Sequence, residues 1–145
     1  MTREPQPFPQ RINFTLDGRP LSAEPGETLL QAAKRAGIDI PHLCHKDGLR
    51  PDGNCRACVV EIEGERALAA ACCRTPSEGM VVKSQDGRPR KAQRLVLELL
   101  QSDMAETRHT HRNELDHWWQ KMERAGPVSL SANNRQRTSH IPPLR

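Results

Sequence analysis

The sequence predicts an α+β fold, and three observations support that prediction. An apolar run of alternating polarity ends in an Asp-Gly pair at positions 17–18. A stretch with helical spacing follows at 28–37, and short apolar runs return after position 58. One helix between two groups of strands predicts a small domain at residues 11–87, which leaves room for a C-terminal extension.

The first strands are expected to form a hairpin. Ile12, Phe14 and Leu16 alternate with polar residues, which is the period of a half-buried strand. Asp17-Gly18 is a strong hairpin signal, because the favoured two-residue turn needs φ above zero at both positions. A second strand is expected at residues 19–23. Residues 1–10, which contain three prolines, are expected to form an extended leader.

The helix has its own start and stop signals. Pro25-Gly26-Glu27 breaks the second strand, and the Thr28 hydroxyl can cap a helix. Gly37 is the expected terminating residue, since glycine readily adopts the left-handed conformation found after helices. The apolar positions between them are Leu29, Leu30, Ala32, Ala33 and Ala36.

Three later strands complete the domain. Residues 59–62 form the first, the turn at 63–65 reverses the chain, and Ala67 to Cys72 returns. Met80 to Lys83 forms the last strand. A hairpin, a helix, a cysteine-bearing loop and further strands, in this order, describe a β-grasp domain.

The extension is expected to be helical at residues 88–125. Pro89 suits a first helical turn, and Asn113 can cap a second helix with Asp116 three residues on. Residues 126–145 lack periodicity and are expected to form an irregular basic tail. The apolar stripes of the two helices are Leu95, Val96, Leu99 and Leu100, and Leu115, Trp118, Trp119 and Met122.

Composition and charge exclude several classes of protein. The net charge is +4, from −1 over residues 1–87 and +5 over 88–145. The basic part lacks the interleaved aromatic residues of a nucleic-acid platform, so no nucleic-acid partner is expected. No apolar run approaches the roughly 20 residues of a membrane span, and the N-terminus has no signal-peptide core. We therefore expect a cytoplasmic protein.

The five cysteines are the one constellation suited to difficult chemistry. They fall at positions 44, 55, 58, 72 and 73, which gives a four-thiolate site with one cysteine to spare. The glycine- and asparagine-rich loop lets the chain wrap closely, which favours an iron–sulfur cluster. Zinc remains the main alternative, although only one Cys-x2-Cys pair is present. Adjacent strand residues point to opposite faces, so only one of Cys72 and Cys73 can readily reach the metal.

Histidines and tryptophans offer further candidates. His42 and His45 flank Cys44, but four cysteines already supply a ligand set, so we expect hydrogen-bonding or surface roles. His109, His111 and His117 lie in a cysteine-free stretch that is expected to be a solvated linker. Trp118 and Trp119 are expected to be packing or docking anchors.

These motifs resemble a known family. Ile-Asp-Ile-Pro-His-Leu-Cys at 38–44, Cys-Arg-Ala-Cys at 55–58 and Cys-Arg-Thr-Pro at 73–76 are similar to the N-terminal 2Fe–2S ferredoxin-like domain of respiratory NADH dehydrogenase, iron hydrogenases and NAD-reducing hydrogenases. The resemblance covers about residues 11–85. In that family the last ligand directly precedes x-Thr-Pro, which implies Cys73, with Cys72 as the fallback. The implied ligands of one 2Fe–2S cluster are Cys44, Cys55, Cys58 and Cys73.

A narrower resemblance is to the N-terminus of the α subunit of NAD-dependent molybdenum or tungsten formate dehydrogenases. It rests on Arg50 to Cys58, Cys72 to Pro76, Leu95 to Asp103 and Glu114 to Trp118. No cysteine follows Cys73, so no further cluster and no catalytic site of its own is expected.

The resemblance implies one-electron transfer within a formate dehydrogenase-like complex. The expected partners are a larger catalytic subunit, on which residues 88–125 would dock, and a flavin/NAD module. A free-standing ferredoxin that serves several reductases and a zinc-binding structural module are the alternatives.

Overall fold

The computed structural model describes residues 10–85, 87–104 and 113–126. The expected leader (apart from residue 10), His109, His111 and the tail beyond residue 126 lie outside these ranges. One five-stranded mixed sheet has the strand order β2-β1-β5-β3-β4, in which only the β1–β5 pair is parallel. The predicted α+β fold is confirmed. Its elements are β1 (Ile12–Leu16), β2 (Arg19–Ala23), α1 (Leu29–Arg35), β3 (Val59–Ile62), β4 (Ala69–Ala70), β5 (Val81–Lys83), α2 (Gly87–Ser102) and α3 (Glu114–Arg124).

The hairpin turn is the one that the Asp-Gly pair predicts. Asp17 has φ 50° and Gly18 has φ 78°, so both central residues are left-handed. The Asp17 carboxylate then reaches across the fold and accepts hydrogen bonds from the Ser84 N–H at 2.6 Å and the Gln85 N–H at 3.2 Å. This contact fixes the chain leaving β5 against the hairpin.

Helix α1 is closed at both ends by its own sequence. The Thr28 hydroxyl accepts from the Gln31 N–H at 3.3 Å, and the Gln31 side chain accepts from the Thr28 N–H at 3.0 Å. Gly37 follows the helix with φ 73°, as expected for a terminating glycine. The apolar face of α1 packs on the sheet in a first core, whose largest fully buried side chains are Leu16, Leu29, Ile40, Val60 and Val82.

The strand expected from Ala67 to Cys72 is shorter than predicted. Only Ala69 and Ala70 pair with β3. The N–H groups of Cys73 and Arg74 both donate to the Ala70 carbonyl at 3.1 Å, so the chain turns immediately after β4. This turn takes Cys72 and Cys73 out of the strand ladder.

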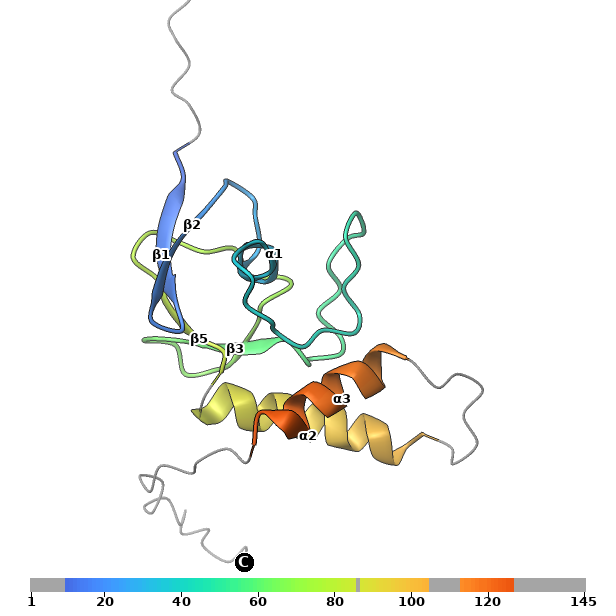
Figure 1. The fold of residues 1–145 in the computed structure, drawn as a ribbon. Coiled ribbons are helices and arrows are strands. Elements are labelled where there is room, and N and C mark those ends of the chain that lie inside the picture. The colour runs from blue at the N-terminus through green and yellow to red at the C-terminus, as the bar shows by residue number, and fades with distance from the viewer. Residues whose placement is uncertain (1–9, 86, 105–112, 127–145) are drawn as a thin grey trace, which may run out of the picture.

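Helices α2 and α3, called here the helix pair, lie on the other side of β3 from α1 (Figure 1). The buried Gln93 side chain joins α2 to the sheet region, because its Nε2 donates to the Val59 carbonyl at 2.8 Å and the Ser84 carbonyl at 3.1 Å. The Asn113 side chain caps α3 by accepting from the Asp116 N–H at 2.8 Å, as predicted. Within the described ranges, no helix is long and apolar enough to cross a membrane.

Candidate metal centre

All five cysteines lie on two connections beside the sheet. Cys44, Cys55 and Cys58 belong to the segment from Pro41 to Cys58, called here the cysteine loop, which joins α1 to β3. Cys72 and Cys73 belong to the turn after β4. Cys44 and Cys55 are half-buried, Cys58 and Cys72 are buried, and Cys73 is exposed.

The loop backbone surrounds the Cys44 sulfur with hydrogen-bond donors. The N–H of Cys55 contributes most, the Cys55 thiol also donates, and the N–H groups of Asn54 and Gly53 add to them. Together these donors lower the pKa of Cys44, because they stabilise the thiolate more than the thiol. Amides directed at a cysteine sulfur are the environment that iron–sulfur ligands require.

Gly53 brings the two connections together. It has φ 69°, and a Cβ at this position would lie 2.9 Å from Cys73 Sγ. The Cys73 sulfur therefore occupies the space that a side chain at position 53 would fill. Because Gly53 also donates to Cys44, the structure places Cys73 beside the same turn of the cysteine loop.

Cys72 has a different environment from Cys73. It is fully buried in the first core and contacts Cys58, and its own Sγ lies 3.6 Å from Cys73 Sγ. Burial raises the pKa of both Cys72 and Cys58. For Cys58, the N–H groups of Cys72 and Ala71 act in the opposite direction. The apolar surroundings of Cys72 suit a packed thiol, whereas Cys73 faces the polar turn.

Arg56 is a residue whose structural role sequence reasoning missed. Its φ of 57° is left-handed, which is uncommon for a residue with a side chain. The next residue, Ala57, donates its N–H to Cys55 Sγ at 3.5 Å, and the Arg56 guanidinium donates to the Leu68 carbonyl at 3.3 Å. No local signal in the sequence reports the sign of this φ.

These sulfur donors fit an iron–sulfur group better than a single ion. Among the described residues, no three His, Cys, Asp or Glu side chains gather closely enough to hold one metal ion. A 2Fe–2S cluster divides four thiolates between two irons, so it needs no such single point of convergence. The fit therefore rests on three features: the donors are all sulfur atoms, backbone amides surround Cys44, and the absence of a side chain at Gly53 leaves room for the Cys73 sulfur.

The neighbouring histidines are not part of this donor set in the structure. His42 Nδ1 lies 2.8 Å from the Ile40 carbonyl, which agrees with the hydrogen-bonding role expected. The His45 side chain is 5% exposed, and neither of its ring nitrogens forms a hydrogen bond with a described residue. The carboxylate oxygen Asp47 Oδ1 lies 3.5 Å from His45 Nε2. His117 lies on α3 rather than in a linker, and it packs against Trp118 with ring centroids 5.2 Å apart.

The helix pair covers one side of the cysteine loop. Trp118 lies 5.1 Å from the His42 ring and is mostly buried, so the apolar face of α3 turns toward the loop. Val96 of α2 and Leu43 of the loop pack on the same cluster. This second core consists of Ala57, Leu97, Trp118 and Met122, with Leu43, Cys55, Val96, Leu115 and Trp119 packed around it.

Another part of the helix pair remains exposed. Leu95, Leu99 and Leu100 of α2 and Met104, two residues after its end, are between 37% and 66% exposed. An open pocket of about 470 Å³ begins here and reaches the cysteine loop. Its lining residues are Leu43, Cys44, Cys55, Leu100, Asp103, Met104 and Leu115.

Comparisons with known proteins agree with this arrangement. The family of 2Fe-2S iron-sulfur cluster binding domains matches residues 9–87. A subunit of NADH-quinone oxidoreductase from Streptomyces coelicolor is 44% identical over 91 residues, which are 61% of this chain and 11% of that protein. NADP-reducing hydrogenase subunit HndD of Solidesulfovibrio fructosivorans is 44% identical over 97 residues, 63% of this chain and 17% of that protein. This chain thus spans less than a fifth of either relative.

A solved structure also resembles this fold. A crystallised NAD+-reducing [NiFe]-hydrogenase, in its H2-reduced state, superposes with a TM-score of 0.56 at 38% sequence identity. The match covers 61% of this chain and 37% of that one.

Proposed function

The chain belongs to the family of 2Fe-2S iron-sulfur cluster binding domains, and we propose that it transfers single electrons within a larger oxidoreductase complex. The cluster accepts and donates one electron at a time, and the protein sets its potential through hydrogen bonds and burial. The observation that carries this proposal is the meeting of Cys44, Gly53 and Cys73 at one turn. Two relatives that contain this domain are named as subunits of NADH-quinone oxidoreductase and of an NADP-reducing hydrogenase.

The ligands we assign are Cys44, Cys55, Cys58 and Cys73. Backbone amides already favour the Cys44 thiolate, and the Ala57 N–H is directed at Cys55. Burial raises the pKa of Cys58, but coordination to iron would favour its thiolate over the thiol. Cys72 remains a core side chain in this assignment.

Replacing the two adjacent cysteines one at a time tests the assignment. After anaerobic reconstitution, we expect wild-type protein and Cys72→Ser to contain two irons and two sulfides per chain. Cys73→Ser should lose the cluster, as measured by iron and sulfide analysis and by the electron paramagnetic resonance of the reduced protein. Cluster loss only in Cys72→Ser would reverse the assignment, and a colourless zinc-loaded wild type would overturn electron transfer.

The partner surface that we propose is the exposed apolar face of α2 and the pocket beside it. Leu99 is 66% exposed on this face, and the pocket reaches Cys44 and Cys55. A redox partner bound here lies close to the thiolates, which electron transfer requires. The occupant that we propose is the larger catalytic subunit of the complex, because the relatives with this domain are named as subunits of oxidoreductases.

A matched pair of exposed leucines tests this surface. Leu99→Asp should weaken co-purification of the larger subunit with the tagged full-length chain. Leu49→Asp should not, although Leu49 is equally exposed at 67%. Equal loss in both variants, or none in either, would contradict the assignment of the contact to α2.

We further propose that this complex is a cytoplasmic formate dehydrogenase with a flavin/NAD module. Support comes from the resemblance of four segments to the N-terminus of formate dehydrogenase α subunits: Arg50 to Cys58, Cys72 to Pro76, Leu95 to Asp103 and Glu114 to Trp118. Mass spectrometry of the co-purifying chains should identify a molybdenum- or tungsten-containing subunit. A hydrogenase or NADH dehydrogenase subunit in its place would leave electron transfer intact and overturn the formate assignment.

A further inference from the structure

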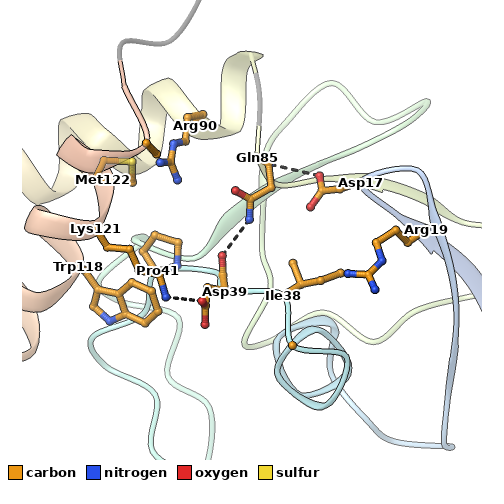
Figure 2. A pocket seen from close by; sticks show the side chains of 12 residues that line it. Asp17, Arg19, Ile38, Asp39, Pro41, Gln85, Arg90, Trp118, Lys121 and Met122 are labelled. Carbon is orange, nitrogen blue, oxygen red and sulfur yellow. Dashed lines mark hydrogen bonds and ion pairs between the residues drawn. The ribbon is translucent and has the colours of Figure 1, made fainter.

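A second pocket lies on the side of α3 that faces the hairpin and α1. It has a volume of about 360 Å³, which is within the range of small-molecule sites. Figure 2 shows that its walls come from the hairpin, the segment after α1, the first turns of α2 and one face of α3. The lining includes no cysteine, so this pocket is separate from the metal centre.

The apolar lining of this pocket is formed by side chains from both halves of the molecule. Ile38 contributes from the segment after α1, and Pro41 contributes from the start of the cysteine loop. Trp118 and Met122 contribute from α3. A ligand in contact with all four would rest against the seam between the sheet domain and the helix pair (Figure 2).

Both carboxylates of the pocket are already occupied. Asp17 accepts hydrogen bonds from the backbone of Ser84 and Gln85. Asp39 forms an ion pair with Lys121 of α3. The negative charges that line the pocket therefore have partners within the protein.

Two guanidinium groups in the pocket have no such partner. Arg90 is half-buried, and neither it nor the exposed Arg19 forms a hydrogen bond or ion pair with any described residue. Burial, together with the nearby charge of Arg94, lowers the pKa of Arg90. A partly desolvated cation without a counter-charge is unfavourable, so a bound anion would stabilise it.

The segment that follows the pocket in the sequence carries no negative side chain. In the sequence, residues 127–145 follow Gly126 and the pocket-lining Ala125. They contain three arginines and no Asp or Glu. Charge complementarity therefore favours an external anion over this segment.

We propose that this pocket binds a small organic anion that carries a phosphate or carboxylate group. Arg90 holds the charged group, with Arg19 across the opening (Figure 2), and the apolar part of the ligand lies along Ile38, Pro41 and Met122. The site is independent of the cluster and of the proposed electron transfer.

The test uses the full-length protein and three probes: inorganic phosphate, citrate and adenosine 5′-monophosphate. A Trp119→Phe background leaves Trp118, which lines the pocket, as the single tryptophan. We expect at least one probe to change its fluorescence saturably and to raise the melting temperature, beyond a sodium chloride control of equal ionic strength. A response to phosphate alone would show that the pocket recognises the charged group. A stronger response to an organic probe would show that the apolar lining also contributes to binding.

Arginine variants separate a built site from general charge attraction. Arg90→Gln should weaken binding about tenfold or more, because it removes charged hydrogen bonds. Arg124→Gln makes the same charge change on an exposed part of α3 outside the pocket and should bind as the parent protein does. If Arg90→Gln fails to fold, Arg90→Lys should fold and bind with intermediate affinity. Equal loss in the Arg90 and Arg124 variants, or no saturable response to any probe, would overturn the proposal.

Discussion

The sheet domain and the helix pair bury their apolar residues in different ways. The first core is closed within the sheet and α1, where Leu16, Val60 and Val82 are fully buried. The second core is completed only by the cysteine loop, because Leu97 and Trp118 pack against Ala57. The helix pair therefore shields the loop on one face and leaves Leu99 exposed on another.

This difference revises the role expected for residues 88–125. The resemblance implies that these residues dock on a larger catalytic subunit. In the structure they share a core with the loop that carries Cys44, Cys55 and Cys58. Docking remains a proposal for the exposed leucines, whereas Trp118 and Met122 are buried within the protein's own fold.

The largest expected effects come from one substitution made in each core. Leu16 and Leu97 are both 0% exposed, so the same truncation can be compared directly. Leu16→Ala should cost stability near the upper end of about 2–5 kcal/mol, and Leu97→Ala near the lower end. The smaller cost is expected because the seam beside Leu97 can relax locally.

Denaturant unfolding gives these two costs, and hydrogen exchange locates them. Leu97→Ala should speed exchange in α2 and α3 while β1 and β5 stay protected. Equal costs in stability, with hydrogen exchange raised throughout the protein, would show that the two cores unfold as one unit.

A pair of glycines separates backbone strain from damage to the metal site. Gly53 and Gly64 have φ of 69° and 88°, but only at Gly53 would a Cβ meet another group, namely Cys73 Sγ. Both alanine variants should lose roughly 1–2 kcal/mol of stability, because a side chain is strained at positive φ. Gly53→Ala should also lose most of its bound iron after reconstitution, whereas Gly64→Ala should keep it. Retention of iron by Gly53→Ala would show that Cys73 does not need this space.

The smallest effects should come from ion pairs. Hydrogen bonding to Arg35 lowers the pKa of Glu27. The Glu27 carboxylate therefore contributes stability above the pKa of the unfolded chain, and this contribution is lost as pH falls through the folded-state pKa. Because Arg35 is half exposed and solvent screens the pair, Glu27→Gln should cost at most about 1 kcal/mol at pH 7.

The corresponding contact of the helix pair should matter less. Asp39 and Lys121 form an ion pair in which both side chains are about half exposed. Asp39→Asn should therefore change stability by less than about 0.5 kcal/mol. Thermal melts of both carboxylate variants between pH 3 and pH 7 provide the measurement. A larger cost for Asp39→Asn would mean that this contact, rather than the second core, holds α3 in place.

Local signals predicted much of the fold. The Asp17-Gly18 turn, the Thr28 cap and the Asn113 cap are confirmed because each depends on residues within three positions. The strand expected from Ala67 to Cys72 is too long, since the turn bonds to the Ala70 carbonyl compete with pairing to β3. The burial of the His45 side chain, which is 5% exposed, is not marked by any local pattern in the sequence.

Local patterns along the chain predict the sulfur donors and the fold class. Cysteine spacing and hydrophobic period are local properties of the chain, and they predicted the sulfur-rich loop and the α+β order. Long-range packing places Cys73 against Gly53, Cys72 in the first core and Trp118 against the cysteine loop. These outcomes join residues far apart in sequence, and they depend on which buried surfaces fit together once the chain has folded.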